Sequence, residues 1–408
     1  MSSELLQTFD TVATAVDAGV SEDDRKDLLQ ACNKLIAKLE SPPDTATRLL
    51  FSAHQAMAVR LGVDLKLFDA LAYGSTTSEQ LAADTNKNAD PLLVTRIMRF
   101  LSAMSVVKET EQNGYALTPF AAALQSSSPL SAAFIHRYGC FISEDNGPVF
   151  IWTSTHFLTV LSRLPEYFHH NGWKSPDDGF NGPFQYAMGT DAHYFDFLNT
   201  HPYYQQAFNT VMSLPFRRRG QDWFEFFPVT ERLNVPGESN VLIVDVGGNQ
   251  GEDLKKLKKR FPDLSGRLII QDLPVVVEGA QDLPPGIEAH GHDFFQQQPI
   301  CYSRAYFMRT VLHDWPDKQA RLILRRLHAA MGSDSILLIN EAMLPEEEAP
   351  LGSVLSDMQM MGSFASLERT EGQWQQLLEA SGFDLVRVWL PDGFQTDHAV
   401  LFEARRKT

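Results

Sequence analysis

The stretch from Val241 to Gly251 reads V-L-I-V-D-V-G-G-N-Q-G, an apolar run that ends in an acid and breaks into a glycine-rich turn. A nearly continuous run of Val, Ile and Leu is typical of a strand that is buried on both faces. Glycines directly after such a strand let the backbone approach a ligand that side chains would exclude. The stretch therefore predicts a buried strand that ends at a site for a nucleotide-type cofactor.

The chain from Asn240 onward alternates strand-like and helix-like segments. We expect strands at Val241 to Val246, Arg267 to Gln271, Tyr306 to Leu312 and Ser335 to Asn340, and helices at Gly251 to Phe261 and Pro316 to Met331. Such alternation predicts a doubly wound α/β domain with a parallel sheet, whose ligands bind at the carboxyl ends of the strands. Leu385 to Trp389 and Ala399 to Glu403 are candidates for a closing pair of strands.

The glycine turn departs from the dinucleotide fingerprint G-x-G-x-x-G, because Val246 stands where the first glycine is required. Asp245 adds a negative charge that would repel a pyrophosphate but suits a cation or an amino group. Asp272, which ends the next strand, can accept both hydroxyls of a ribose. These acids favour S-adenosylmethionine (SAM) over a nicotinamide cofactor, and an NAD(P)-dependent oxidoreductase is the disfavoured alternative.

The first part of the chain, from Leu5 to about Leu124, is predicted to be mainly helical and ends in a hairpin with an Asn113-Gly114 turn. Helix, helix, hairpin is a winged-helix pattern. As a DNA reader, however, its second helix, Leu92 to Met104, offers only Arg96 and Arg99 among apolar residues. A net charge of −16 also argues against a nucleic-acid partner. We expect this helix to serve packing.

Length and composition bear on the number of domains, on metal or disulfide sites and on membrane association. A chain of 408 residues has room for two domains. Cys32, Cys140 and Cys301 share no metal or disulfide spacing, no apolar run approaches the roughly 20 residues of a membrane span, and no presequence is visible. We expect a cytoplasmic protein with no metal and no membrane association.

The region from Ser131 to Pro236 is rich in aromatic residues. Tyr204, Phe208 and Met212 fall at i, i+4 and i+8, on one face of a helix. Two interpretations stay open at this point: plain helix packing, or the wall of a pocket for a flat substrate.

The motifs V-D-V-G-G-N-Q-G, Q-D-L-P, H-D-F-F, L-H-D-W-P-D and L-E-R-T-E follow one another in this order. From about Ala53 to the C-terminus, the chain resembles the class I SAM-dependent O-methyltransferases of the plant caffeate type, in their fungal natural-product branch. The resemblance implies a winged-helix-like dimerisation domain in residues 1–130, pocket-lining helices in 131–236 and a Rossmann-like SAM-binding domain in 237–408. It also implies a homodimer that methylates a hydroxyl of an aromatic or polyketide-type small molecule.

The resemblance assigns roles residue by residue. The catalytic base would be His313, flanked by the acids Glu341 and Glu368. The cofactor would be held by Gly247, Gly248, Asp272, Leu273, Asp293, Phe294 and Arg309. The substrate pocket would be lined by Tyr204, Phe208, Met212, Met360 and Phe364. A histidine suits this base, because its pKa lies near neutral pH and a phenol must lose its proton to attack a methyl group.

Three points leave other interpretations open. Some fungal relatives of this architecture bind SAM and catalyse pericyclic or dehydration reactions, for which Arg309 and His136 would be the candidates here. Asn249 stands where the family usually has a third glycine, and Asn tolerates a left-handed backbone. The residues before Ala53 align to nothing definite, and we interpret them as extra dimer-contact helices.

Overall fold

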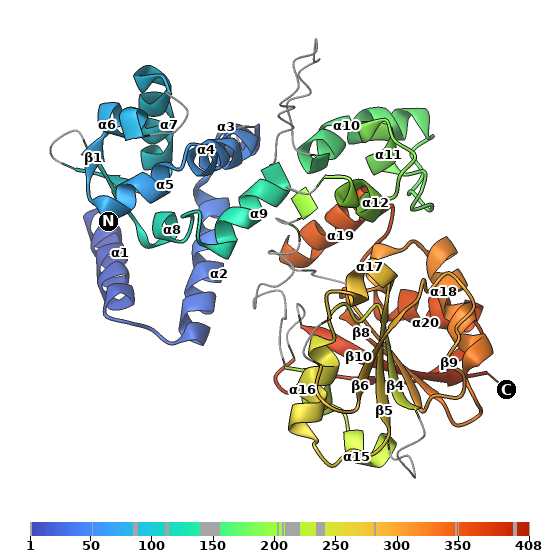
Figure 1. The fold of residues 1–408 in the computed structure, drawn as a ribbon. Coiled ribbons are helices and arrows are strands. Elements are labelled where there is room, and N and C mark those ends of the chain that lie inside the picture. The colour runs from blue at the N-terminus through green and yellow to red at the C-terminus, as the bar shows by residue number, and fades with distance from the viewer. Residues whose placement is uncertain are drawn as a thin grey trace. The chain divides into compact units, whose positions relative to one another are not determined.

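The structure is a computed structural model of the chain. It describes residues 2–50, 52–84, 89–110, 114–138, 156–201, 204, 205, 208, 221–233, 241–280, 283–346, 349, 351–394 and 398–407. These residues form two compact units, 1–122 and 123–408, each with its own packing (Figure 1).

The N-terminal unit is mainly helical, as predicted. Its helices are α1 (Ser2–Asp17), α2 (Glu22–Leu39), α3 (Pro42–Leu50), α4 (Ser52–Asp64), α5 (Leu67–Ala70), the 3-10 helix η1 (Leu71–Tyr73), α6 (Ser78–Asp84), α7 (Pro91–Ala103) and α8 (Pro119–Ala122). A small sheet of order β1-β3-β2 joins β1 (Thr76–Thr77), β2 (Val107–Glu109) and β3 (Gly114–Leu117). The predicted order of helix, helix and hairpin is present as α6, α7 and β2–β3.

Helix α7 begins as its sequence indicates. The side chain of Asp90 accepts hydrogen bonds from the backbone N–H groups of Leu92 and Leu93, and Pro91 occupies the first turn. Its inner face buries Val94, Ile97, Met98 and Leu101. Helix α7, which corresponds to the helix that a DNA-binding protein would place in a groove, therefore packs its apolar residues in the core of the unit.

The C-terminal unit is built on a seven-stranded sheet of order β6-β5-β4-β7-β8-β10-β9. Its strands are β4 (Val241–Val246), β5 (Arg267–Asp272), β6 (Ile287–Gly291), β7 (Ala305–Arg309), β8 (Ile336–Ala342), β9 (Phe383–Trp389) and β10 (Ala399–Arg406). The pairs from β6 to β8 are parallel, whereas β10 pairs antiparallel with both β8 and β9. The doubly wound sheet and its closing pair of strands are thereby confirmed.

Two strands differ from the sequence prediction. β6 was missed, because this short edge strand carries the polar residues Glu288 and His290 and lacks a long apolar run. β7 ends at Arg309 and does not reach Leu312, because Thr310 has a left-handed backbone (φ 49°) and a 3-10 helix, η3 (Leu312–Asp314), follows. The early end of β7 matters for function, since His313 lies in η3.

Helices cover both faces of this sheet (Figure 1). On one face α18 (Asp317–Ala330) and α20 (Glu371–Ala380) pack in a core with Val244, Tyr306 and Met308, and on the other α14 (Trp223–Phe226), α15 (Val229–Arg232) and α16 (Glu252–Arg260) pack in a core with Ile243 and Ile270. The other helices among the described residues of this unit are α9 (Pro129–Tyr138), α10 (His156–His170), α11 (Pro183–Met188), α12 (Tyr194–Asn199), α17 (Pro274–Val277) and α19 (Leu351–Phe364). Among the described residues, no helix is long and apolar enough to cross a membrane.

Candidate active site

The glycine turn after β4 has the backbone that its sequence indicates. Gly247 and Gly251 have φ values of 76° and 79°, and Asn249 has a left-handed φ of 51°. A Cβ atom on Gly247 would lie 2.7 Å from a methyl group of Val311, so the turn packs directly against the loop that carries His313. The N–H groups of Gly247 and Gly248 donate to the carbonyl oxygen of Gln271, which ties the turn to β5.

Asp272 ends β5 beside this turn. One of its carboxylate oxygens accepts a hydrogen bond from the backbone N–H of Asn249 (2.9 Å), and the other accepts one from Leu273 (2.8 Å). Burial raises the pKa of this carboxyl group, while the two backbone hydrogen bonds lower it. The carboxylate is thus held at the carboxyl end of a parallel strand, where open α/β sheets bind ligands.

Asp245 lies beneath the same turn. Its side chain is buried, and a Cβ atom on Gly248 would lie 2.7 Å from its Oδ2 atom, which has no hydrogen-bond partner. Burial and the nearby carboxylates of Asp253 and Asp272 raise its pKa well above the usual range. This environment favours the neutral acid, so Asp245 supplies less negative charge at the turn than its sequence position indicates.

Arg309, at the end of β7, forms a 2.5 Å ion pair with Asp253 of α16. Asp293 and Phe294 follow β6, and Asp293 accepts a hydrogen bond from the N–H of Phe295 (2.9 Å). The ring of Phe294 meets that of Trp315 edge-on, with centroids 5.9 Å apart. The structure thus places Phe294 beside the loop of His313, while the cofactor roles of all three residues stay predictions.

The loop from Thr310 to Trp315 is held by a buried acid. One oxygen of Glu341 accepts hydrogen bonds from the N–H groups of Val311 and Leu312 (both 2.9 Å) and of His313 (3.4 Å). Glu341 has no exposed surface, and its other oxygen has no hydrogen-bond partner. The acid satisfies the free N–H groups of a short helical turn, as a capping residue does.

The carbonyl groups of the same loop are held from the other side. Buried Arg369 donates to the carbonyl oxygens of Leu312 (2.9 Å) and Trp315 (2.8 Å), and Ser366 donates to that of His313 (2.6 Å). The backbone around His313 is therefore fixed through both its donors and its acceptors, which is what a precisely placed side chain requires.

The imidazole ring of His313 lies between two carboxylates. Its Nδ1 atom is 3.3 Å from Oε1 of Glu368, and its Nε2 atom is 3.5 Å from Oδ1 of Asp314. Glu368 is itself oriented by α19, since Ser356 donates to its Oε1 atom (2.8 Å) and Asp357 accepts from its backbone N–H (2.9 Å). A carboxylate on Nδ1 fixes the tautomer and stabilises the imidazolium, as in other histidine bases.

The acids around His313 shift its proton affinity. Burial lowers the pKa of His313, but the carboxylates of Asp314, Glu341 and Glu368 outweigh burial and raise it to about 10. Burial raises the pKa of Glu341 to about 7. Burial also acts to raise the pKa of Glu368, yet His313 and Ser356 lower it overall. Glu368 is therefore the charged partner of the ring, and Glu341 is the acid that titrates near neutral pH.

The two acids that the resemblance places beside His313 thus hold different parts of the residue: Glu341 holds its backbone and Glu368 its ring. Sequence reasoning missed Ser356 and Arg369, which support this arrangement. Arg369 follows Glu368 directly in the L-E-R-T-E motif and could have been examined for that reason. Ser356 lies inside α19, twelve residues before Glu368, and no local pattern marks it.

The aromatic residues predicted to line the substrate pocket meet in one cluster. It contains Tyr204, Phe208, Met360 and Phe364, which pack with α10, α11 and α12. Phe364 contacts Tyr194 edge-on with centroids 4.9 Å apart. Met212 and the side chain of His136 lie outside the described residues. Packing accounts for these contacts, and the pocket wall stays a prediction.

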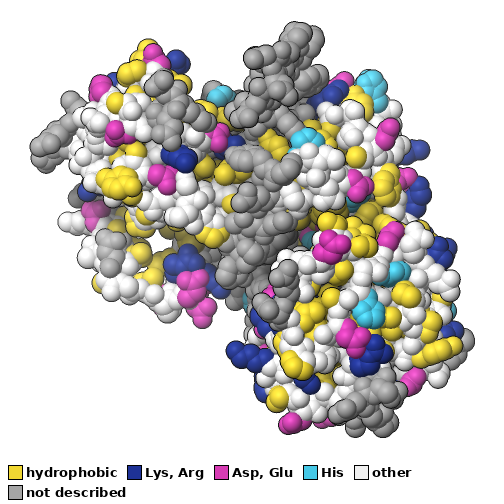
Figure 2. Space-filling view, viewed as in Figure 1, with side chains coloured by type: hydrophobic (Ala, Val, Ile, Leu, Met, Phe, Trp, Pro, Cys, Tyr) yellow, Lys and Arg dark blue, Asp and Glu magenta, His cyan; other side chains and the backbone are white. Residues whose placement is uncertain are grey.

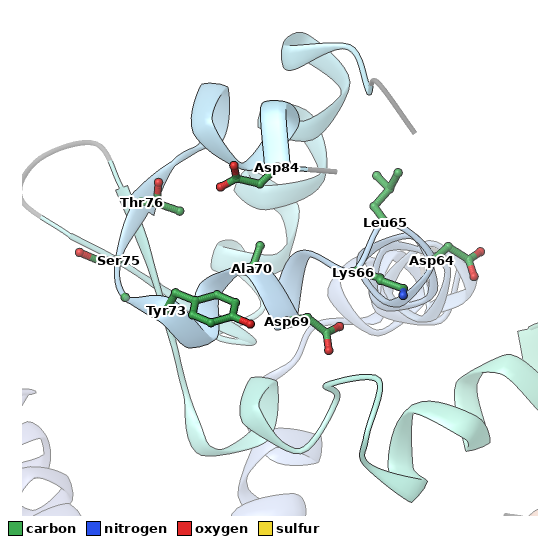
Figure 3. Close-up of a pocket in the computed structure, with 10 residues that line it drawn as sticks. Asp64, Leu65, Lys66, Asp69, Ala70, Tyr73, Ser75, Thr76 and Asp84 are labelled. Carbon is green, nitrogen blue, oxygen red and sulfur yellow. The ribbon is translucent and has the colours of Figure 1, made fainter. Parts of the chain in front are cut away.

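A hollow of about 640 Å³ opens on the N-terminal unit (Figure 3). Tyr73, Asp69 and Asp84 are among the residues that line it. It contains none of the residues predicted for catalysis or cofactor binding.

On the face shown in Figure 2, Lys and Arg side chains are interspersed with acidic ones and form no single basic patch.

Two family models match this chain. The O-methyltransferase domain matches residues 175–384, and the O-methyltransferase dimerisation domain matches residues 47–127. A demethylsterigmatocystin 6-O-methyltransferase of Aspergillus parasiticus is 31% identical over 90% of this chain and 89% of its own length. The O-methyltransferase mfmE of Annulohypoxylon moriforme is 32% identical over 94% of this chain and 92% of its own. The chain belongs to the O-methyltransferase family, and its dimerisation domain supports a homodimer.

Three solved structures share this fold over nearly the whole chain. OxaC in complex with sinefungin and meleagrin has a TM-score of 0.80 and 27% identity, covering 98% of both chains. LepI in complex with SAM has a TM-score of 0.81 and 26% identity, covering 100% of both chains. A structure described as a pericyclic reaction enzyme has the same TM-score and identity, covering 99% of this chain and 100% of its own.

Proposed function

We propose that this chain transfers a methyl group from SAM to a phenolic or enolic hydroxyl of an aromatic or polyketide-type small molecule. The observation that carries the proposal is the setting of His313. Its backbone is fixed by Glu341 and Arg369, and its Nδ1 atom faces a buried carboxylate, Glu368. An immobilised histidine with one nitrogen engaged by an acid is suited to taking a proton at its other nitrogen.

The residues at the carboxyl ends of β4, β5 and β6 fit SAM. Asp272 offers a carboxylate for ribose hydroxyls, and Asp293 offers one for the amine of adenine, with Phe294 beside it. The close approach of Gly247 to Val311 leaves no room for a side chain at the turn. Bound SAM supplies the methyl group and a positive sulfonium charge, and a positive charge near an imidazole lowers its pKa.

His313 then acts as the base. Its Nε2 atom, which lies 3.5 Å from Oδ1 of Asp314, would accept the proton of the acceptor hydroxyl, because Nδ1 is engaged by Glu368. The ring must first be neutral, and a nearby sulfonium charge would favour this by lowering the pKa of His313 from about 10. Glu368 stabilises the resulting imidazolium, and Ser356 keeps the carboxylate oriented. We assign the acceptor to the helices of residues 131–236 together with α19, whose aromatic and methionine side chains suit a flat molecule.

The rival function is a SAM-dependent pericyclic or dehydration reaction. The similarity to the structure described as a pericyclic reaction enzyme favours it, because that match covers nearly the whole chain. Its candidate Arg309 is paired with Asp253 in this structure, whereas the pairing of His313 with Glu368 serves proton removal. We therefore place methylation first.

The test uses SAM with a tritium-labelled methyl group and a panel of phenols and enols, incubated with the purified chain. Methylation predicts that label enters the product in step with release of S-adenosylhomocysteine. A SAM-requiring conversion without label in the product would establish the rival function and refute ours. Heat-inactivated protein is the control for non-enzymatic methylation.

A further inference from the structure

Helix α2 lacks the buried face that helices of this length normally have. It spans 18 residues, and none of its side chains is buried. Its apolar residues form one stripe, made up of Leu28, Leu29, Cys32, Leu35, Ile36 and Leu39. Leu29, Ile36 and Leu39 are 52%, 46% and 73% exposed. Since helices in proteins take most of their stability from packing of such a face, this stripe is expected to be covered in solution.

Helix α1 has a matching stripe. Phe9, Val12 and Val16 fall at i, i+3 and i+7, and all three are exposed. The two helices are successive arms of one hairpin (Figure 1), and Ser21 caps the start of α2 by accepting a hydrogen bond from the N–H of Asp24. Two neighbouring uncovered apolar stripes on polar helices mark an interaction surface.

The charges of α2 indicate what covers it. Residues 22–30 carry four acidic and two basic side chains, whereas residues 31–39 carry only Lys34 and Lys38. The first half is therefore net negative and the second half net positive. A second α2 laid antiparallel brings opposite charges together at both ends, whereas a parallel one brings like charges together.

We propose that α1 and α2 dock on the same two helices of a second copy of this chain, with the two α2 helices antiparallel. A surface that is complementary to itself in this way satisfies the two-fold symmetry of a dimer. It is also continuous along the chain with the matched dimerisation domain, which begins at residue 47. The hairpin lies outside that match and adds a contact of its own. The proposal does not depend on which reaction the enzyme catalyses.

Cys32 provides a native probe. It is exposed, and it lies in the stripe near the middle of α2, where an antiparallel pairing of the charged halves places the two-fold axis. With a rise of about 1.5 Å per residue and helix axes about 8–10 Å apart, both Cys32 thiols lie within reach of a short bis-maleimide. In the full chain carrying Cys140→Ser and Cys301→Ser, we expect a covalently linked dimer. Its absence, with Cys32 shown to react with a monofunctional maleimide, would overturn the proposal.

A pair of charge variants tests the stripe itself. Leu29→Glu with Ile36→Glu should lower the fraction linked through Cys32 at least tenfold at equal concentration, because it places acids in the apolar contact. Gln30→Glu with Ala37→Glu adds the same charge on the opposite face of α2 and should leave the linked fraction within twofold. Equal loss in both pairs, or in neither, would contradict the proposal.

Amide hydrogen exchange of α2 distinguishes a second copy from other occupants. Protection of α2 that falls on dilution of the wild-type chain, is retained by Gln30→Glu with Ala37→Glu and is lower in the stripe pair at the same concentration supports the proposal. Protection that is independent of concentration would mean that another part of the same chain covers the stripe. Fast exchange at every concentration would mean that nothing covers it. Both of these results would refute docking of a second copy.

Discussion

Two loops leave neighbouring parallel strands of the sheet and are built in opposite ways. The turn after β4 is held mainly by backbone hydrogen bonds to Gln271 and by one acid, Asp272, and its glycines are packed so closely that a Cβ atom on Gly247 would lie 2.7 Å from Val311. The loop after β7 is held by Glu341, Arg369 and Ser366, which fix its donors and acceptors alike. The turn after β4 therefore presents bare backbone that a cofactor can approach, whereas the loop after β7 keeps one side chain in a fixed position.

The largest effect is expected from His313→Ala. If the β7 loop exists to place this base, the variant should lose about 100- to 10,000-fold in kcat with an unactivated phenol, because general-base catalysis contributes about that much. SAM affinity, measured by calorimetry, should change little. His290→Ala, on edge strand β6, is the matched control. Turnover close to wild type in His313→Ala would show that the loop holds a residue with another role.

Variants of Glu341 separate two effects of this residue: its hydrogen bonds to the loop backbone and the effect of its negative charge on His313. Glu341→Ala leaves up to three buried N–H groups without an acceptor and should lower the free energy of unfolding by about 3 kcal/mol or more. Glu341→Gln keeps an acceptor oxygen and should have a free energy of unfolding near that of the wild type, while the pKa of His313 falls because one carboxylate is gone. Denaturant unfolding and NMR titration measure the two effects. If both variants unfold alike, backbone capping is not what Glu341 does.

The contact between the two loops is tested at Gly247. Gly247→Ala places a methyl group 2.7 Å from Val311 at a positive φ, and should destabilise the fold by about 2 kcal/mol. Adding Val311→Ala removes the clash but not the backbone strain, so it should restore part of the loss. Thermal unfolding of both variants and of Val311→Ala alone closes the cycle. Strictly additive effects would mean that the two loops are independent.

Asp272→Ala should weaken SAM binding about tenfold, equivalent to about 1.4 kcal/mol, if this carboxylate holds the ribose. Asp263→Ala, at an exposed turn, is the control. Calorimetric titration with SAM and a thermal melt without it separate affinity from folding. Unchanged affinity would move the ribose site elsewhere.

The smallest effect concerns His193, which stacks on Trp315 at the end of the β7 loop (4.4 Å between ring centroids). Burial lowers the pKa of His193 to about 4. In the unfolded chain the pKa of His193 is near 6.5. The contribution of His193 to the free energy of unfolding is therefore present above pH 6.5 and is lost as the pH falls toward 4. Between pH 7 and 5.5 the wild type should lose about 1 kcal/mol more stability than His193→Phe. Parallel stability curves would contradict this pKa.

The sequence carries the parts of this fold that are local. Val241 to Gly251 predicts its strand and turn, because apolar residues and glycines act where they stand. β6 was not predicted, since an edge strand needs no apolar run. The early end of β7 was not predicted either, because Thr310 adopts a left-handed backbone that is not expected for its residue type.

The site divides in the same way. His313, Glu341 and Glu368 can each be identified from their motifs. The sequence does not show, however, that Glu341 binds the backbone of His313 and Glu368 its ring. Glu341 reaches the backbone of the loop from β8, whereas Glu368 reaches the ring from the segment after α19, and both placements depend on how these elements pack. Ser356 reaches Glu368 from α19, and such contacts arise only when the chain folds.

That last contact has a consequence for how the enzyme tells acceptors apart. The helix that orients the acid partner of His313 also carries Met360 and Phe364, the residues proposed to touch the acceptor. A molecule that displaces α19 would bind and still be turned over slowly, because it disturbs the acid while occupying the site. Selectivity would then appear in the rate of reaction more than in affinity, and substitutions on α19 that widen the range of acceptors would cost speed on every one of them.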